Sequence, residues 1–207
     1  PLYRWEAHEA EGFAWWIARL RSTLRRVDLA RLDHFRGFQA YWEVPADSET
    51  AVNGRWAMGP GTAFLESVSN ALGGLPLIAE DLGNITPEVL ALRDRFDLPG
   101  MKILQFAFGG GLDNFYFPYR YPENCVVYTG THDNNTTLGW FRETAEDAHQ
   151  TPEHREAERA FVLRYTGTDG REIHWDLIRV AHGSVADTSI VPMQDVLGLG
   201  REARMNM

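Results

Sequence analysis

The sequence contains a single cysteine, Cys125, among 207 residues. It therefore has no internal disulfide and no cysteine pair for a zinc site, which is typical of a reducing compartment. No apolar run reaches the roughly 18 residues that a membrane-spanning helix needs. Basic residues are also scarce, because 20 of them face 29 acidic ones and leave a net charge of −9. We therefore expect a cytoplasmic protein whose partner is neither a nucleic acid nor a membrane.

Glycine-rich phosphate loops are missing as well. No expected strand leads into a dinucleotide-binding or P-loop motif, and the triple glycine at 109–111 leads into an aromatic loop instead of a helix. Aromatic residues, in contrast, make up 12% of the chain, and many lie in expected loops. Ordinary packing explains any one of these residues, but flat rings clustered in loops beside polar groups suit the apolar faces of a sugar.

Short apolar runs alternate with amphipathic stretches along the chain. The runs predict strands that end near residues 33, 80, 105, 130 and 193. After the first strand, breaker residues predict a long loop from Asp33 to about residue 59. Helices are expected at 9–25, 64–72, 85–96, 152–165 and 172–182. This order indicates an α/β fold with parallel strands buried on both faces. A doubly wound sheet and part of a (β/α)₈ barrel both fit, and the missing phosphate loop weakens the first.

Three of these strands lead into carboxylates, namely Asp33, Glu80 and Asp133. Catalytic side chains of parallel β/α folds lie at the C-terminal ends of strands. Arg31 lies two residues before Asp33 and therefore points to the same side of the strand, where it would keep the carboxylate ionised. Helix caps, loop hydrogen bonds and a structural ion pair would explain the same residues without catalysis.

Five motifs carry a resemblance to a known family: RLDHFRGF, IAEDLG, LPGMKILQFAFG, VVYTGTHDNNTTLGW and VPMQDVLGLGREARMN. In this order they resemble the 4-α-glucanotransferases, also called amylomaltases or disproportionating enzymes, which are related to the α-amylases. The resemblance extends over essentially the whole chain. It implies a retaining transferase on a (β/α)₈ barrel that acts in glycogen, starch or maltose metabolism. Its partners would be α-1,4-glucans and malto-oligosaccharides, and it would need no cofactor.

The resemblance also implies catalytic roles. Asp33 would be the nucleophile that forms a covalent glucosyl intermediate, and Glu80 would be the general acid and base. Asp133 would stabilise the transition state by holding sugar hydroxyls. Two carboxyl groups about 5–5.5 Å apart are what a retaining glycosidase mechanism requires. The alternatives are an α-1,4-glucan hydrolase of the amylase type and an inactive fragment that only binds carbohydrate.

Further residues are implied to bind substrate. His132 would lie in the donor subsite, Arg31 would orient Asp33, and Trp5 and Asn206 would line the glucan site. His34 would contact substrate or, equally well, fix a loop by hydrogen bonding. No third ligand accompanies His132 and Asp133 at a telling spacing, so we expect no metal.

The length is short for a complete barrel, which takes about 250 residues. We expect residues 1–207 to be the C-terminal portion of a barrel domain, with about the last five strands and no separate second domain. Such a slab leaves strand edges unpaired, so we expect the isolated chain to be unstable or to self-associate.

Overall fold

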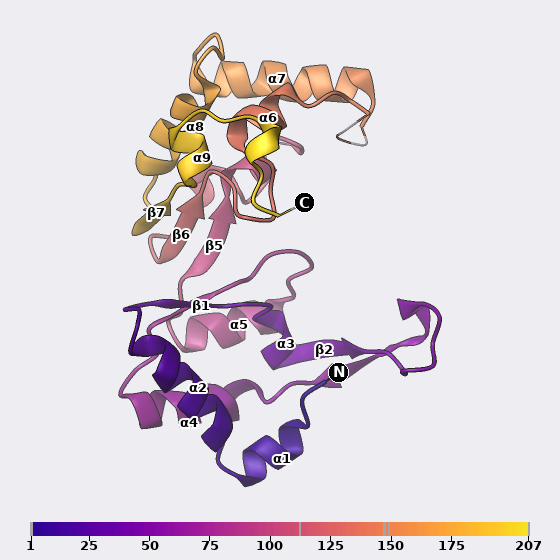
Figure 1. Cartoon of the computed structure of the whole chain (residues 1–207), viewed down its shortest axis with the longest axis vertical. Coiled ribbons are helices and arrows are strands. Elements are labelled where there is room, and N and C mark those ends of the chain that lie inside the picture. The colour runs from indigo at the N-terminus through magenta and orange to yellow at the C-terminus, as the bar shows by residue number, and fades with distance from the viewer. Residues whose placement is uncertain (1, 112, 147, 149, 207) are drawn as a thin grey trace. The chain divides into compact units, whose positions relative to one another are not determined.

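The structure is a computed structural model that describes residues 2–111, 113–146, 148 and 150–206 (Figure 1). It divides into two compact units, residues 1–101 and residues 102–207. Helices and short strands alternate along both units, as the sequence predicts. Within the described ranges, none of the helices has the length and apolar character needed to cross a bilayer.

The first unit begins with two helices, α1 (Trp5–Ala10) and α2 (Ala14–Leu24). The sequence pattern predicts one helix over residues 9–25, and this is wrong at its start. Phe13 separates α1 from α2 with a φ of 56°, a left-handed conformation that interrupts a right-handed helix. Beyond the break, Trp16 and Leu20 are buried and lie four residues apart, as on the inner face of an amphipathic helix.

Two parallel strands of the first unit carry the predicted catalytic residues at their ends. β1 (Ala30–Leu32) pairs with β4 (Leu77–Ala79), and the chain passes between them through α4 (Gly61–Leu72). All three residues of β4 are buried, as expected for a strand of a parallel sheet. After β4 the chain forms α5 (Pro87–Arg95) and enters β5 (Gly100–Ile103). Just before β5, the carbonyl of Pro99 accepts the N–H of Ala79 at 2.9 Å.

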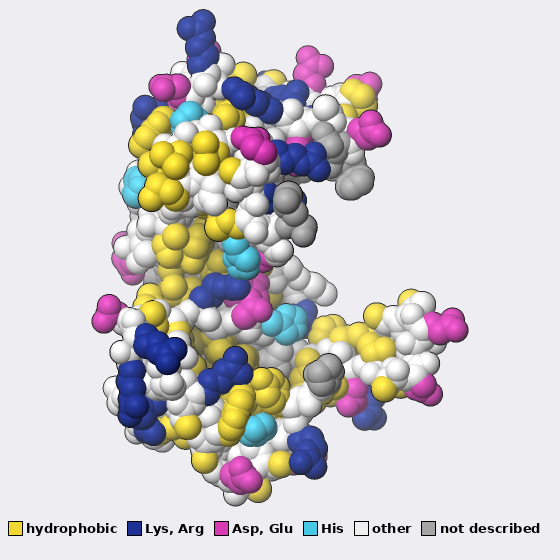
Figure 2. Space-filling model, viewed as in Figure 1, with side chains coloured by type: hydrophobic (Ala, Val, Ile, Leu, Met, Phe, Trp, Pro, Cys, Tyr) yellow, Lys and Arg dark blue, Asp and Glu magenta, His cyan; other side chains and the backbone are white. Residues whose placement is uncertain are grey.

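The long loop predicted after Asp33 is wrong, because this segment forms a β-hairpin. A short helix, α3 (Arg36–Gln39), leads into β2 (Ala40–Glu43), which pairs antiparallel with β3 (Arg55–Met58). A 3₁₀ turn, η1 (Ala51–Asn53), precedes β3. Trp42 faces Trp56 across the pair, with ring centroids 5.3 Å apart. Figure 1 shows the hairpin extending away from α2 and α4, and Figure 2 shows hydrophobic side chains along it.

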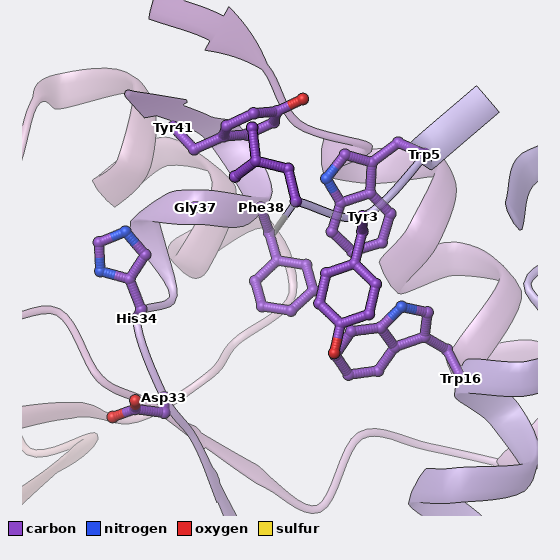
Figure 3. A pocket seen from close by; sticks show the side chains of 9 residues that line it. Tyr3, Trp5, Trp16, Asp33, His34, Gly37, Phe38 and Tyr41 are labelled. Carbon is purple, nitrogen blue, oxygen red and sulfur yellow. The ribbon is translucent and has the colours of Figure 1, made fainter. Parts of the chain in front are cut away.

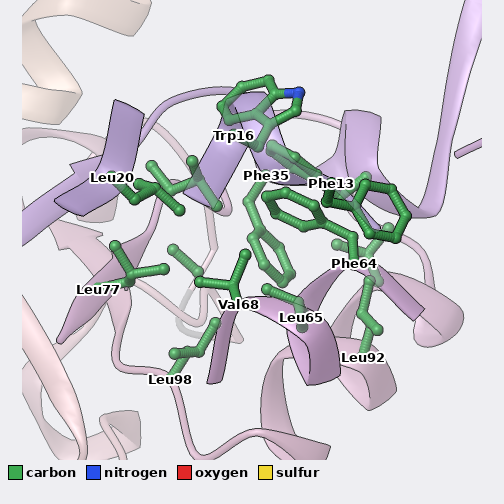
Figure 4. Close-up of a cluster of buried hydrophobic side chains, with 14 residues drawn as sticks. Phe13, Trp16, Leu20, Phe35, Phe64, Leu65, Val68, Leu77, Leu92 and Leu98 are labelled. Atoms are coloured by element: carbon green, nitrogen blue, oxygen red, sulfur yellow. The ribbon is translucent and has the colours of Figure 1, made fainter. Parts of the chain in front are cut away.

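One hydrophobic core holds the first unit together (Figure 4). Phe64, Leu65 and Val68 of α4 are fully buried and pack with Phe13 and Phe35, which are also buried. The same cluster includes Leu32 of β1 and Leu77 of β4, so the core lies directly against the β1–β4 sheet. The packed helices thereby support the two strands that end at Asp33 and Glu80.

The second unit is built on a three-stranded sheet in the order β5–β6–β7. β6 (Cys125–Tyr128) runs parallel to β7 (Thr188–Ile190), with Val127 opposite Ser189. The five strands expected from apolar runs are therefore present, although each is shorter than expected. The helices and 3₁₀ turns of this unit are α6 (Thr137–Arg142), α7 (Pro152–Thr166), α8 (Ile173–His182), α9 (Met193–Val196), η2 (Leu104–Ala107), η3 (Pro118–Arg120) and η4 (Arg201–Ala203).

Candidate active site

Asp33 and Glu80 follow neighbouring strands of the first unit. β1 and β4 are parallel, and Leu32 lies opposite Ala79, so Asp33 and Glu80 are the next residues of the two strands. Backbone hydrogen bonds continue past the strand ends. The N–H of Glu80 donates to the carbonyl of Leu32, and the N–H of Phe35 donates to the carbonyl of Glu80, each at 3.1 Å. These bonds fix both carboxylate-bearing residues at the same end of the sheet.

Arg31 contacts Asp33, as their spacing on the strand predicts. The Nη2 atom of Arg31 donates to Oδ1 of Asp33 at 2.6 Å, which is the length of a charge-assisted bond. The Asp33 side chain is 74% exposed, whereas that of Arg31 is 28% exposed. The guanidinium therefore orients a carboxylate whose surface is mostly exposed and open to a ligand.

The backbone around Asp33 also holds the side chain of Glu80. The N–H of His34 donates to Oε2 of Glu80 at 2.7 Å, and the N–H of Leu82 donates to Oε1 at 3.1 Å. His34 adopts a φ of 49°, a conformation that residues other than glycine rarely take and that is concentrated at functional sites. The bend after Asp33 thus directs an amide group at the carboxyl group of the neighbouring strand.

Asp81, two residues after β4, is bonded to both β5 and α5. Its buried carboxylate accepts the N–H of Met101 at 2.7 Å and pairs with Arg93 of α5 at 2.5 Å. Burial acts to lower the pKa of Arg93, but the hydrogen bond to Asp94 and the charge of Asp81 outweigh it and raise that pKa. Gly100 makes room for the pair, because a Cβ there would lie 2.4 Å from Oδ2 of Asp81. Glu80 therefore lies between β4 and a firmly tethered residue, Asp81.

A pocket of about 330 Å³ lies next to Asp33 (Figure 3). Figure 3 shows the rings of Tyr3, Trp5, Trp16 and Phe38 gathered together on one side of it. Trp5 and Trp16 are stacked with centroids 5.9 Å apart. The pocket is also lined by Leu2, Asp33, His34, Gly37 and Tyr41. Apolar ring faces beside a carboxylate and an imidazole are chemically suited to a sugar ring.

Asp133 belongs to the second unit, where it is exposed and surrounded by polar groups. Its Oδ1 accepts Nδ2 of Asn206 at 2.7 Å, and its Oδ2 lies 3.3 Å from Nε2 of His132. Its backbone carbonyl accepts Nη2 of Arg204, also at 2.7 Å. The structure thus brings the predicted residues His132, Asp133 and Asn206 together.

Several residues of these two clusters escaped prediction. Arg204 reaches Asp133 across 71 positions of sequence, and the amides of His34 and Leu82 act through backbone geometry alone. No local sequence pattern predicts such contacts. The motif RMN at 204–206 was the only available signal for Arg204, since it includes Asn206.

Within the described part of the chain, His, Cys, Asp and Glu side chains form no group of three or more that could hold a metal ion. Cys125 is buried in β6. The clusters around Asp33, Glu80 and Asp133 place carboxylates beside hydrogen-bond donors, and aromatic rings lie next to Asp33.

Comparison with known proteins matches the whole chain. A family model described as 4-alpha-glucanotransferase matches residues 1–207. The chain is 51% identical over 210 residues to the 4-alpha-glucanotransferase of Synechocystis sp. and 52% identical over 214 residues to that of Thermus thermophilus. It is covered completely in both alignments but spans only 40% and 41% of those relatives.

A solved structure agrees with these alignments. The amylomaltase from Streptococcus agalactiae, in complex with acarbose, superposes with a TM-score of 0.89 at 36% sequence identity. The match covers 100% of this chain and 40% of that one. The chain therefore spans about two fifths of the length of each of these relatives.

Proposed function

The chain belongs to the 4-alpha-glucanotransferase family, and on that premise we propose that the protein transfers α-1,4-glucan segments from a donor glucan to the 4-hydroxyl group of an acceptor. The observation that carries the proposal is the pair of carboxylates on neighbouring parallel strands. Asp33 is oriented by Arg31, and the side chain of Glu80 is held by the amide of His34. A nucleophile and an acid that must act on one bond need this kind of fixed support.

In the first step, Asp33 attacks the anomeric carbon of the donor glucan. A bond forms between a carboxylate oxygen and that carbon while the bond to the glycosidic oxygen breaks. Glu80 in its acid form gives its proton to the departing oxygen, so the shortened glucan leaves as an alcohol. The product is a covalent glucosyl ester of Asp33 and an ionised Glu80.

In the second step, the ionised Glu80 takes the proton from the 4-hydroxyl group of an acceptor glucan or glucose. The hydroxyl oxygen attacks the anomeric carbon, and Asp33 leaves as a carboxylate. Two inversions give net retention of configuration. Water in place of the acceptor would give hydrolysis, so a preference for sugar hydroxyls is what makes the protein a transferase.

The other predicted residues supply binding. We assign Asp133 to the sugar hydroxyls whose bonds strengthen in the transition state, with His132 and Asn206 orienting it. Trp5 and His34 line the aromatic pocket beside Asp33, where a glucose ring would stack. We further propose that β1, β4, β5, β6 and β7 are the last five strands of a (β/α)₈ barrel.

The proposed substrates are α-1,4-glucans and malto-oligosaccharides. The acarbose complex of the Streptococcus agalactiae amylomaltase supports this class of ligand. A cytoplasmic location stays a prediction.

The proposal is tested by analysing the products that the full-length protein forms from maltotriose. Transfer gives glucose together with oligosaccharides longer than maltotriose, whereas glucose and maltose alone indicate a hydrolase. We expect Asp33→Asn and Glu80→Gln to abolish both reactions without loss of folded structure by circular dichroism. Glu66→Gln, which alters an exposed carboxylate paired with Arg95, is the matched control and should stay active. Wild-type activity in either catalytic variant would refute the assignment.

A further inference from the structure

Asp195 is a carboxylate that the mechanism above does not use, yet it is among the most deeply buried groups of the second unit. It lies on α9 and is 1% exposed. A buried carboxylate is unfavourable unless hydrogen bonds replace its hydration. The structure supplies these bonds from a single neighbouring segment, the loop of residues 129–137 that carries Asp133.

The bonds reach both ends of that loop. At its start, Oγ1 of Thr129 donates to Oδ2 of Asp195 at 2.5 Å. At its end, Thr137 donates through its backbone N–H to Oδ1 at 2.7 Å and through Oγ1 to Oδ2 at 2.8 Å. Thr129 and Thr137 are completely buried. One carboxylate thus ties together the two points at which the chain leaves and re-enters the core.

The remainder of the loop is braced from within. Oδ1 of Asn134 accepts both the N–H and the hydroxyl of Thr131 at 2.8 Å. Nε2 of Gln105, in η2, donates to the carbonyl of Asn135 at 3.0 Å. The base of the loop is therefore buried and bonded, while the side chain of Asp133 at its tip is 62% exposed.

We propose that Asp195 is a positioning residue for Asp133: by clamping Thr129 and Thr137 it fixes the loop so that Asp133 meets the sugar hydroxyls at the required place. This inference rests on the role proposed for Asp133. A misplacement of about 1 Å can lower a rate by about 100-fold, so a group without substrate contact can still govern the rate.

The first measurement is independent of activity. In the full-length protein, hydrogen–deuterium exchange of peptides that cover residues 129–137 should speed up in Asp195→Ala and stay near wild type in Asp176→Ala. Asp176 is a matched control, since it is also buried and also accepts a threonine hydroxyl, that of Thr168 at 2.8 Å, away from this loop. Unchanged exchange over residues 129–137 in Asp195→Ala would overturn the clamp.

The second measurement is a double-mutant cycle with an activated glucosyl donor, so that slow variants remain measurable. Asp195→Ala should lower kcat by about 10- to 100-fold, and Asp195→Asn, which keeps its shape and can still bond the hydroxyls, should recover part of the loss. In an Asp133→Asn background, Asp195→Ala should cause little further loss, because a residue that acts through Asp133 has nothing left to position.

The outcomes separate the two claims. If Asp195→Ala lowers kcat by the same factor in the wild-type protein and in the Asp133→Asn variant, the role of Asp195 is merely structural and the inference is overturned. A wild-type protein without glucan products, or an Asp133→Asn variant of full activity, would refute the proposed function instead. In that case faster exchange in Asp195→Ala would still establish the clamp.

Discussion

At the scale of single residues, backbone conformation decides how the proposed acid is held. His34 combines a left-handed φ of 49° with an amide that donates to Glu80 at 2.7 Å. Its neighbour Asp33 bonds Arg31 at 2.6 Å. The short segment of residues 31–34 therefore orients both carboxyl groups on which the proposed chemistry depends.

We predict that His34→Gly is more stable than His34→Ala. Both variants lose the imidazole, but glycine accepts a positive φ without the strain that a Cβ introduces, a difference of about 1 kcal/mol. Urea unfolding of the full-length protein measures it. Equal stabilities would show that the left-handed conformation is not retained at this position.

We also predict that Gly100→Ala destabilises the protein by about 1–3 kcal/mol, the usual range for an overpacked site. The new methyl group would lie 2.4 Å from Oδ2 of Asp81 and 2.8 Å from Nη1 of Arg93. Gly111→Ala is the control, because its Cβ would have no neighbour within 4 Å, and it should stay within about 0.5 kcal/mol of wild type. Equal unfolding midpoints for the two variants would contradict the packing described for Asp81.

The sequence could predict part of this residue-scale picture. The contact between Arg31 and Asp33 follows from the two-residue period of a strand, and it is present. The amide of His34 and the guanidinium of Arg204 could not be predicted in the same way. Their contacts depend on the path of the chain after a strand ends, which no periodic pattern describes.

At the scale of elements, two helices that begin with similar sequences are capped differently at their N-termini. Thr151-Pro152-Glu153 and Thr86-Pro87-Glu88 look like equivalent N-terminal caps. The Thr151 side chain accepts the N–H of His154 at 3.2 Å, whereas Thr86 makes no capping bond to the backbone. Instead, a hydrogen bond from Thr86 is the main cause that lowers the pKa of Glu88.

We therefore predict that Thr151→Ala lowers the free energy of unfolding by about 1 kcal/mol, the typical value of a lost cap, and that Thr86→Ala lowers it by less. Thermal unfolding of both variants in the same buffer compares them directly. A larger loss in Thr86→Ala would show that its hydroxyl caps α5 after all.

Tyr121, which precedes β6, gives a pH-dependent prediction. Burial raises the pKa of its phenol well above the ordinary value, with further contributions from the Cys125, Tyr165 and Tyr116 groups. The folded state thus keeps a proton that the unfolded state loses above about pH 10. Stability from this group is present below that pH and falls by about 1.4 kcal/mol per unit as the pH rises further.

Tyr121→Phe should remove this dependence. Its unfolding free energy should decline less than that of wild type between pH 9 and pH 11, by about 1 kcal/mol. The variant also loses the 2.7 Å hydrogen bond from Oη of Tyr121 to the carbonyl of Tyr116. This loss should lower the stability of the variant by an amount that does not depend on pH. Parallel pH profiles for the two proteins would contradict the burial of the phenol.

Elements were predictable where a short run of sequence decides them. The strands β1, β4, β5, β6 and β7 lie in or next to the apolar-rich runs of the sequence, and they were predicted. The β2–β3 hairpin was missed because its strands join through residues 44–54, too long a connection to show a tight-turn signature. The contact between Trp42 and Trp56 forms between residues far apart in sequence, so no local pattern indicates it. Breaker residues such as Pro45 and Gly54 indicated a loop instead.

At the scale of the whole molecule, family membership and structural similarity agree. The chain superposes on an amylomaltase with a TM-score of 0.89, over 40% of that protein. The closed barrel and the self-association of the isolated chain stay predictions. Which strands would complete the sheet could not be inferred from local patterns, because barrel closure depends on residues far apart in sequence.

The central claim is that Asp33 carries the glucosyl unit during transfer. Glu80→Gln protein, treated with α-glucosyl fluoride, should accumulate the ester, because this donor needs little acid assistance to form it and the variant lacks the base that activates an acceptor. Trypsin cleavage after Arg31 and Arg36 isolates the peptide of residues 32–36 for mass spectrometry. The account predicts that this peptide is heavier by one glucosyl group, located on Asp33. A glucosyl group on any other residue, or continued transfer by Asp33→Asn, would contradict it.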